Sequence, residues 1–206
     1  ALGAAGLAAW PFIFSSAYAL RVFTLAGIYT ILVIGYQFVY GHAGALALTQ
    51  GAFFGFGAYI TGLLGAKLGW SAALTLPVSV LGPVLLAAFV AIPVLRLETH
   101  YFALATLGIA QILLLLTIKW ESLTGGANGL PGVPGLTIAG ITVPAGLPMV
   151  LVVWGVVALA GLFSWQTMRG SYGQAFHVMR SDGILAGAIG IDVARLRAVA
   201  FLLSAA

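Results

Sequence analysis

Long apolar runs with almost no charge recur along this chain and limit what it can fold into. Residues 19–40, 72–95, 100–118 and 147–165 each approach the roughly 20 apolar residues that a helix needs to cross a bilayer. Of the 206 residues, 62% are hydrophobic and only 6% are charged, too few charges to cover a water-soluble globule. Because a backbone in lipid must satisfy its own hydrogen bonds, we predict an all-α, polytopic transmembrane helix bundle.

Residues 43–66 are apolar but unusually rich in glycine, with two polar residues, Thr49 and Gln50, in the first half. Gly51 and Gly55 have the GxxxG spacing, which places two glycines on one helix face and lets another backbone approach closely. Two interpretations are open: a tightly packed ordinary span, or a re-entrant or broken helix. Residues 1–14 are apolar but short, and we expect the tail of a span in a fragment cut at both ends.

Two segments do not have the pattern of a span. Residues 120–146 are rich in glycine and proline, which argues against a continuous helix. Residues 166–197 hold six of the twelve charges and contain two candidate short helices, 172–180 and 183–190. The positive-inside rule places 166–197 and Arg96 in the cytoplasm and 120–146 outside.

The sequence contains few signals of catalysis. It has no Walker A motif, no HExxH zinc motif and no cysteine, and its basic residues form no run that would indicate nucleic-acid binding. None of the four carboxylates falls in the middle of a predicted span, as the ionisable groups of ion-coupled transporters usually do. We therefore predict a single membrane domain over 1–206 that is not an enzyme, binds no metal or cofactor and draws its driving force from a partner.

Four blocks of sequence carry a family resemblance. They are GHAGALALTQGAFFGFGAY at 41–59, RLETHYFALATLG at 96–108, LTGGANGL at 123–130 and GQAFHVMRSDGILAGAIGI at 173–191. In this order and spacing they resemble the permease subunits of ABC importers for branched-chain amino acids, specifically the LivM-like half. The chain departs from the family pattern at Ala47, Thr99, Gln174 and Gly183, which leaves the substrate and particular contacts of the 173–191 block open.

The resemblance implies a complex of two permease subunits, two cytoplasmic ATPases that bind ATP and Mg, and a periplasmic substrate-binding protein. It assigns 166–197 to a cytoplasmic coupling loop whose helix pair sits in a groove on the ATPase, with an apolar face that includes Ala175 and Phe176. An amphipathic helix lying on the bilayer surface is the alternative that composition alone allows. The coupling residues that the resemblance implies are Gly173, Ala175, Phe176, Arg180, Asp182, Ala186 and Gly190.

Two further groups of residues are candidates for the substrate route. A substrate path is expected along Gly44, Thr49, Gln50, Phe53, Gly55 and Gly57, although all of these are alternatively helix-packing residues, and each glycine alone is more typical of helix packing. A loop that faces the binding protein is expected at Thr124, Gly125, Gly126 and Asn128, where a turn-forming role is the alternative.

The function that follows from the resemblance is import of branched-chain or related amino acids across the bacterial inner membrane, driven by ATP on partner subunits. The alternatives are an ABC permease for urea, amides or simple sugars, an ion-coupled secondary transporter, and a membrane assembly subunit that transports nothing.

Overall fold

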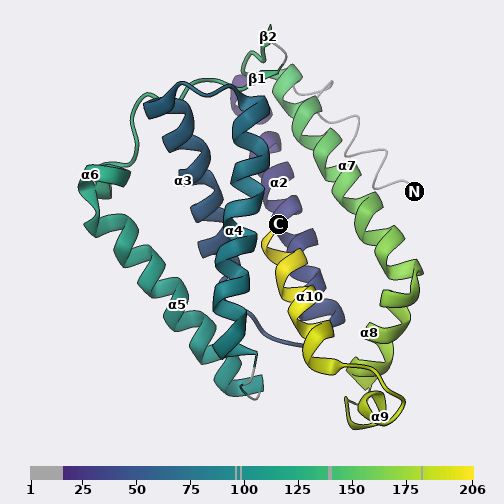
Figure 1. Ribbon diagram of the computed structural model, residues 1–206. Coiled ribbons are helices and arrows are strands. Elements are labelled where there is room, and N and C mark those ends of the chain that lie inside the picture. Colours follow the sequence, from purple (N-terminus) through teal and green to yellow (C-terminus); the bar gives the residue numbers. More distant parts are fainter. Residues whose placement is uncertain (1–15, 96, 98, 139–140, 182) are drawn as a thin grey trace.

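The computed structural model describes residues 16–95, 97, 99–138, 141–181 and 183–206, most of which lie in long helices (Figure 1). The long helices are α2 (Ala17–Tyr36), α3 (Gln50–Leu68), α4 (Ala72–Val94), α5 (Thr99–Lys119), α7 (Leu147–Arg169) and α10 (Val193–Ala205). A π-helix, η1 (Gln37–His42), continues α2. The short elements are α6 (Glu121–Thr124), the 3-10 helix η2 (Gly126–Asn128), the paired strands β1 (Thr137–Ile138) and β2 (Ile141–Thr142), α8 (Ser171–Ser181) and α9 (Gly183–Ala188).

The all-α, polytopic fold predicted from the sequence is confirmed. Among the described residues, five helices are long and apolar enough to cross a membrane: Ala17–His42, Gln50–Leu68, Leu74–Val94, Tyr101–Lys119 and Leu147–Arg169. The two short helices expected within 166–197 are present as α8 and α9. The predicted tail at 1–14 and Arg96 lie outside the described residues.

Local signals explain where several helices begin and end. The side chain of Ser16 accepts a hydrogen bond from the Ala19 N–H (3.2 Å) at the start of α2, and Asp192 accepts one from the Arg195 N–H (3.0 Å) at the start of α10. Gly69 ends α3 in the left-handed conformation (φ 64°), which glycine adopts without steric cost.

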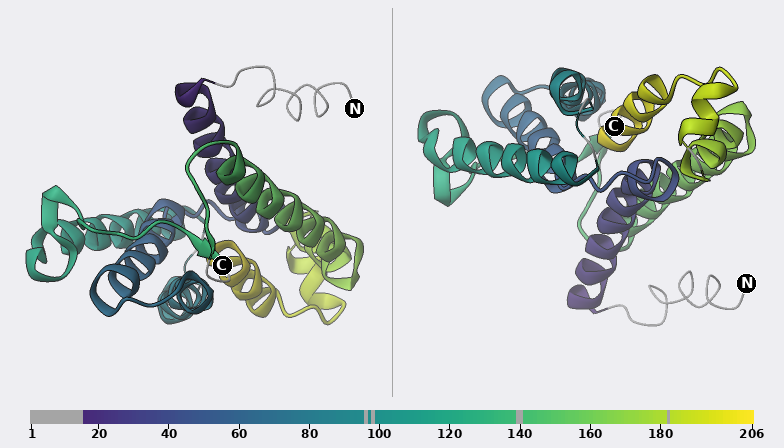
Figure 2. Two further views of the ribbon diagram at one scale, coloured as in Figure 1. Left: turned by 90° about the horizontal axis from the view of Figure 1, so that it is seen from above. Right: turned by 90° about the horizontal axis from the view of Figure 1, so that it is seen from below.

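The helices form two groups joined by α10. In the views along the bundle, α2 and α7 run side by side, α3, α4 and α5 form the second group, and α10 lies between them (Figure 2). Buried side chains concentrate around α10, where Ala200 is fully buried and Phe201 is 1% exposed. The faces of the helices turned away from α10 are largely apolar and exposed, as expected for surfaces that meet lipid or another subunit.

Small residues allow close packing within each group. A Cβ atom placed on Gly57 of α3 would lie 3.0 Å from the carbonyl oxygen of Ser79 in α4, a carbonyl to which Pro83 cannot donate the usual helical hydrogen bond. A Cβ on Gly27 of α2 would lie 2.6 Å from Val153 of α7, and beside it the Trp154 indole donates to the Phe23 carbonyl (3.2 Å). Glycine at these positions therefore sets the distance between neighbouring helices.

The structure differs from the sequence-based expectation at three places. The glycine-rich span begins at Gln50 instead of residue 43, because residues 43–49 are not helical and form an irregular segment after η1. The segment 120–146 contains the short β1–β2 hairpin, which the turn-rich sequence did not specify. Helix α10 was not predicted, because its first residues, including Arg195 and Arg197, belong to the charged segment 166–197 that was expected to be a loop.

We predict that Gly57→Val destabilises the chain through the α3–α4 contact. The new methyl groups meet the Ser79 backbone, and overpacking of this kind costs about 1–3 kcal/mol. The apparent melting temperature of the purified protein in detergent should fall by about 2–4 °C for each kcal/mol.

Gly55→Val is the matched control, because a Cβ on Gly55 would meet nothing within 4 Å and the change in helix propensity is the same. Equal melting temperatures for the two variants would contradict the close α3–α4 contact.

Candidate functional site

A cleft of about 760 Å³ lies between α3 and α5. Its walls are mainly aliphatic and aromatic side chains, with polar groups from Tyr59, Gln111 and Thr117. The volume falls in the range of about 300–1,000 Å³ that is typical of small-molecule sites, and an apolar lining with a few polar groups is the usual composition of such sites.

The wall of this cleft on α3 begins with glycine and alanine, which leave it open near the start of the helix. Gly51, Ala52 and Gly55 line the cleft, and a Cβ on either glycine would meet no other atom within 4 Å. The GxxxG face predicted to receive another backbone is therefore open within the described chain. Gly57, by contrast, faces α4 and serves packing.

The α6–η2 turn forms the far end of the cleft. Thr124 and Gly126 line it, and the buried Thr124 hydroxyl donates to the Thr117 carbonyl (2.6 Å) and accepts from the Gly126 N–H (3.2 Å). Gly125 has φ 78°, and a Cβ there would lie 2.0 Å from the Gly129 carbonyl oxygen. Lys67 at the end of α3 donates to the Ser122 carbonyl of α6 (3.0 Å), so α3 is joined at this end to the short helix that follows α5.

The remaining residues predicted for the path lie elsewhere. Phe53 is buried with its ring centroid 5.5 Å from that of Phe201, and the Gln50 side chain bonds Ser204 of α10. Thr49 is fully buried, and its hydroxyl finds no partner among the described residues. Gly44 has φ 67° and lies near the Arg180 side chain. Of the six predicted residues, only Gly55 lines the α3–α5 cleft; contact with substrate stays a prediction for all of them.

Asn128 completes the group predicted to face a binding protein. It is exposed in η2, at the same end as Thr124, Gly125 and Gly126. The four residues are brought together by one compact turn. Both the expected contact and the turn-forming role fit this position.

The second candidate site is the helix pair α8–α9, at the end of the bundle opposite the α6–η2 turn (Figure 1). The apolar face of α8 is buried in this chain's own core, with Phe176 1% exposed and Met179 5% exposed. Ala175 is partly buried against that core, and Ala186 of α9 is fully buried. These side chains hold the pair against the bundle, and the surface left for a partner is the exposed side of α8, including Gln174, His177 and Arg180.

The corners before and after the pair depend on glycine. A Cβ on Gly173 would lie 1.8 Å from the Met168 carbonyl oxygen, so any other residue there must displace α8 from the end of α7. Gly190 has φ 85°, which lets the chain turn after α9 before Asp192 starts α10.

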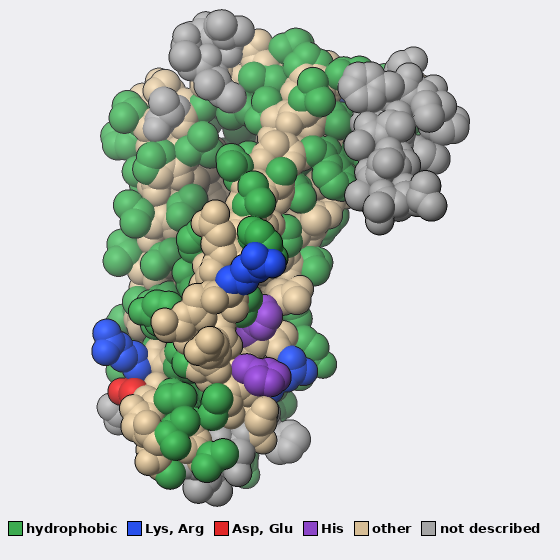
Figure 3. Space-filling view, turned by 90° about the vertical axis from the view of Figure 1, so that its right-hand side faces the viewer, with side chains coloured by type: hydrophobic (Ala, Val, Ile, Leu, Met, Phe, Trp, Pro, Cys, Tyr) green, Lys and Arg blue, Asp and Glu red, His purple; other side chains and the backbone are tan. Residues whose placement is uncertain are grey.

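Basic side chains gather at the end that carries α8. Figure 3 shows Lys, Arg and His side chains in the lower half of the face formed by α7 and α8, with apolar side chains above them. The Arg180 guanidinium donates to the Gly41 carbonyl in η1, and Arg169 lies over the Trp165 ring (3.9 Å to the centroid). Asp182, the other charged residue predicted to act in coupling, lies outside the described residues.

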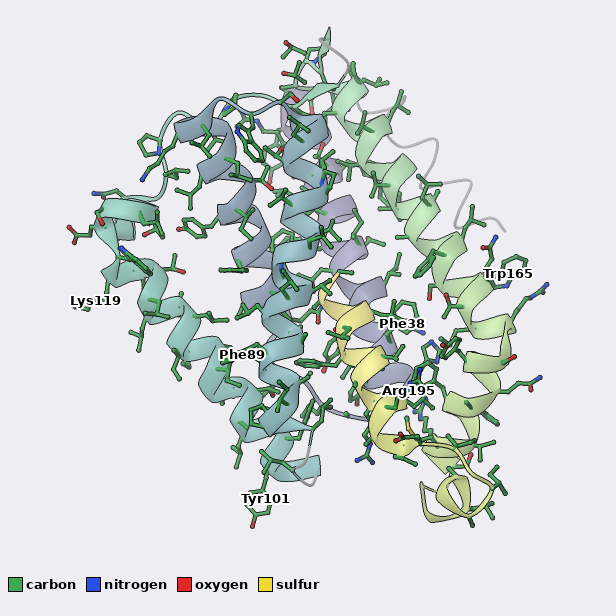
Figure 4. All side chains as sticks on the ribbon, in the orientation of Figure 1. Phe38, Phe89, Tyr101, Lys119, Trp165 and Arg195 are labelled. Carbon is green, nitrogen blue, oxygen red and sulfur yellow. The ribbon has the colours of Figure 1, made fainter. Side chains whose placement is uncertain are left out.

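Amphipathic and basic side chains mark the ends of the long helices. Figure 4 shows Tyr101 and Lys119 at the two ends of α5, and Trp165 on the outer side of α7 near its last turns. Such residues favour the interface between lipid and water. No group of three or more metal-ligating side chains occurs in the described part of the chain. The arrangement is that of a multi-pass membrane protein with a cleft between helices and a separate helix pair at one end.

Comparisons with known proteins assign this membrane protein to a family. Residues 18–206 match the model of a family described as "Branched-chain amino acid transport system / permease component". The chain is 30% identical over 221 aligned residues to the high-affinity branched-chain amino acid transport system permease protein LivM of Escherichia coli K12, and equally to that of Salmonella typhimurium LT2. Each alignment covers 96% of this chain and 52% of the relative, so the chain spans about half the length of these relatives. No solved structure matches. The chain belongs to this permease family.

We predict that Gly173→Ala loosens the α7–α8 corner. Its Cβ cannot coexist with the Met168 carbonyl oxygen, so α8 must move and the contact of Arg180 with Gly41 weakens. Trypsin should then cleave after Arg180 several-fold faster in the purified protein, because local opening governs proteolysis.

Gly187→Ala in α9 is the control, because a Cβ there meets nothing within 4 Å. Cleavage at the wild-type rate in Gly173→Ala would show that α8 does not depend on this corner.

Proposed function

We propose that this chain is the membrane-spanning transport subunit of an ATP-driven importer that carries branched-chain or related amino acids across the bacterial inner membrane. It works with a second permease subunit, two cytoplasmic ATPases and a periplasmic substrate-binding protein. The observation that carries the proposal is that one chain of this permease family combines the α3–α5 cleft with a helix pair at the opposite end.

The cleft favours substrates with apolar side chains. Apolar residues, among them leucine, isoleucine, phenylalanine and alanine, line most of it, and burial of an aliphatic side chain is favourable by about 0.8 kcal/mol per CH₂. Tyr59, Gln111 and Thr117 are polar groups that can receive the charged end of an amino acid. A cleft for sugars would need many more hydrogen-bonding groups, which is why the sugar importer is less well supported.

The driving force comes from outside this chain. The sequence contains no Walker A motif, so ATP and Mg belong to the partner ATPases. The exposed side of α8 and the adjoining α9 form the surface on which we expect an ATPase to dock. A partner shifts a conformational equilibrium only through different affinities for two states, so ATP must change how that surface is bound.

Uptake by the complete transporter in proteoliposomes tests the proposal. The wild-type complex should accumulate labelled leucine, isoleucine or valine only with ATP and the binding protein, and an uncoupler should leave uptake unchanged. Uptake that an uncoupler abolishes would support an ion-coupled transporter, and transport of ribose or urea in place of amino acids would support the alternative importers.

We predict that Gly55→Leu reduces leucine uptake at least tenfold without reducing assembly. The leucine side chain enters the open cleft instead of displacing a neighbouring helix. Initial uptake rates in proteoliposomes give the measurement.

Gly155→Leu in α7 is the control, because that position also has no neighbour within 4 Å but lies outside the cleft. Loss of the second permease subunit on purification of Gly55→Leu would instead identify the GxxxG face as a subunit contact.

A further inference from the structure

Three helices meet at a polar contact in the middle of the bundle. The Ser204 hydroxyl of α10 donates to the Gln50 side-chain oxygen (2.6 Å), and the Gln50 amide nitrogen donates back to the Ser204 carbonyl (2.5 Å). The two residues are 154 positions apart in sequence. Ser204 is 3% exposed, so each group would be costly to leave without a partner.

The third helix, α2, comes close to this contact at Gly35, which has no side chain. A Cβ on Gly35 would lie 3.1 Å from the Ser204 carbonyl oxygen and 3.3 Å from the Gln50 amide nitrogen. A side chain at position 35 therefore crowds both partners, whereas glycine leaves the reciprocal pair undisturbed. We call Gly35, Gln50 and Ser204 the three-helix junction.

We propose that the three-helix junction transmits movement of the α8–α10 segment to α3, and that Gln50 and Ser204 are positioning residues for transport. This inference rests on the proposed function. Gln50 is the first residue of α3, and the next residues, Gly51 and Ala52, line the cleft. A displacement of α10 that carries Gln50 with it therefore changes the cleft wall directly.

Aromatic packing also joins α10 to α3 near the junction. Phe201, one helical turn before Ser204, packs edge-on against Phe53 of α3 (centroids 5.5 Å apart) and Phe102 of α5 (6.0 Å). Both helices that line the cleft thus contact the same side chain of α10. Close-packed side chains transmit displacement because the interior has little free volume.

The other end of α10 is attached to the helix pair. Helix α10 contacts α8, α9 and η1, and Arg180 of α8 donates to the Gly41 carbonyl of η1. A partner that moves α8 and α9 therefore acts on the first residues of α10, while the junction lies further along the helix, at Ser204. The structure supplies a continuous path from α8 through α10 to α3.

The test uses the complete transporter in proteoliposomes and measures ATP hydrolysis and leucine uptake in the same vesicles. Gln50→Leu and Ser204→Ala each break the reciprocal pair, and we expect uptake per ATP hydrolysed to fall at least about fivefold, the lower range of site-to-site coupling. Gly35→Ala should act in the same direction. Ser204→Thr, which keeps the hydroxyl, should retain most of the ratio.

Thr61→Ala is the matched control in α3, because the Thr61 hydroxyl bonds only the Gly57 carbonyl of its own helix (3.0 Å). A purely structural role predicts that hydrolysis and uptake fall together with the amount of folded complex, leaving the ratio unchanged. An unchanged ratio in Gln50→Leu and Ser204→Ala would overturn the inference while the proposed function stands. Absence of ATP-driven uptake in the wild type would instead overturn the proposed function.

A crosslink between positions 50 and 204 provides a second test, which is needed if the single variants do not fold. The chain has no cysteine, so the double variant Gln50→Cys, Ser204→Cys offers one defined pair for a short thiol-to-thiol crosslinker. We expect a low ratio before crosslinking and recovery afterwards, because the link replaces the lost contact. Crosslinking that blocks uptake in active complexes would show that α3 and α10 separate during transport, which contradicts the proposal.

Discussion

The structure depends on how the irregular segment 43–49 between two helices is held against the rest of the bundle, with Ala43, Ala47 and Thr49 buried. Residues 43–49 leave the helical conformation between η1 and α3, and backbone groups freed in this way are tolerated in a membrane only when protein covers them. The Leu48 N–H bonds the hydroxyl of Thr106, a fully buried residue of α5, and the Ala45 N–H bonds the Val39 carbonyl (both 3.1 Å). Helix α10 packs beside η1 and α3, so the break lies where the bundle is best packed.

The packing of α10 around residues 43–49 explains the division of the molecule into two helix groups. The pair α2–α7 and the group α3–α4–α5 contact each other mainly through α10 and the segment around the break. Elsewhere only a small share of the residues in each long helix is buried. In the most apolar stretch of α7, that share is 6%. The packing shared by the two groups is therefore concentrated around α10 and η1.

Much of the fold followed from hydropathy, since apolar runs of about 20 residues and the glycine- and proline-rich segment 120–146 specify spans and loops directly. Helix α10 could not be found this way, because it carries Arg195 and Arg197 in its first turns and its position is defined by the helices it packs against. The candidate site was only partly predictable. The GxxxG spacing identified Gly51 and Gly55 as one face but could not tell an open face from a packed one, and Gln50 bonds a residue 154 positions away.

Helix α8 is packed against the bundle by its own apolar face, and this limits how a partner can act on it. Its apolar face was expected to lie on a partner, yet Phe176 and Met179 fill the chain's own core, and Phe176 lies beside His42 of η1 (ring centroids 6.4 Å apart). In the proposed transporter, a partner bound to the exposed side of α8 would press on a helix already packed against the segment before the break. Movement of α8 would then reach η1 through buried rings and the Arg180–Gly41 hydrogen bond, and would reach α3 through α10. Since both routes would end on either side of residues 43–49, the proposal makes this irregular segment the place where the chain absorbs the resulting change in backbone dihedral angles.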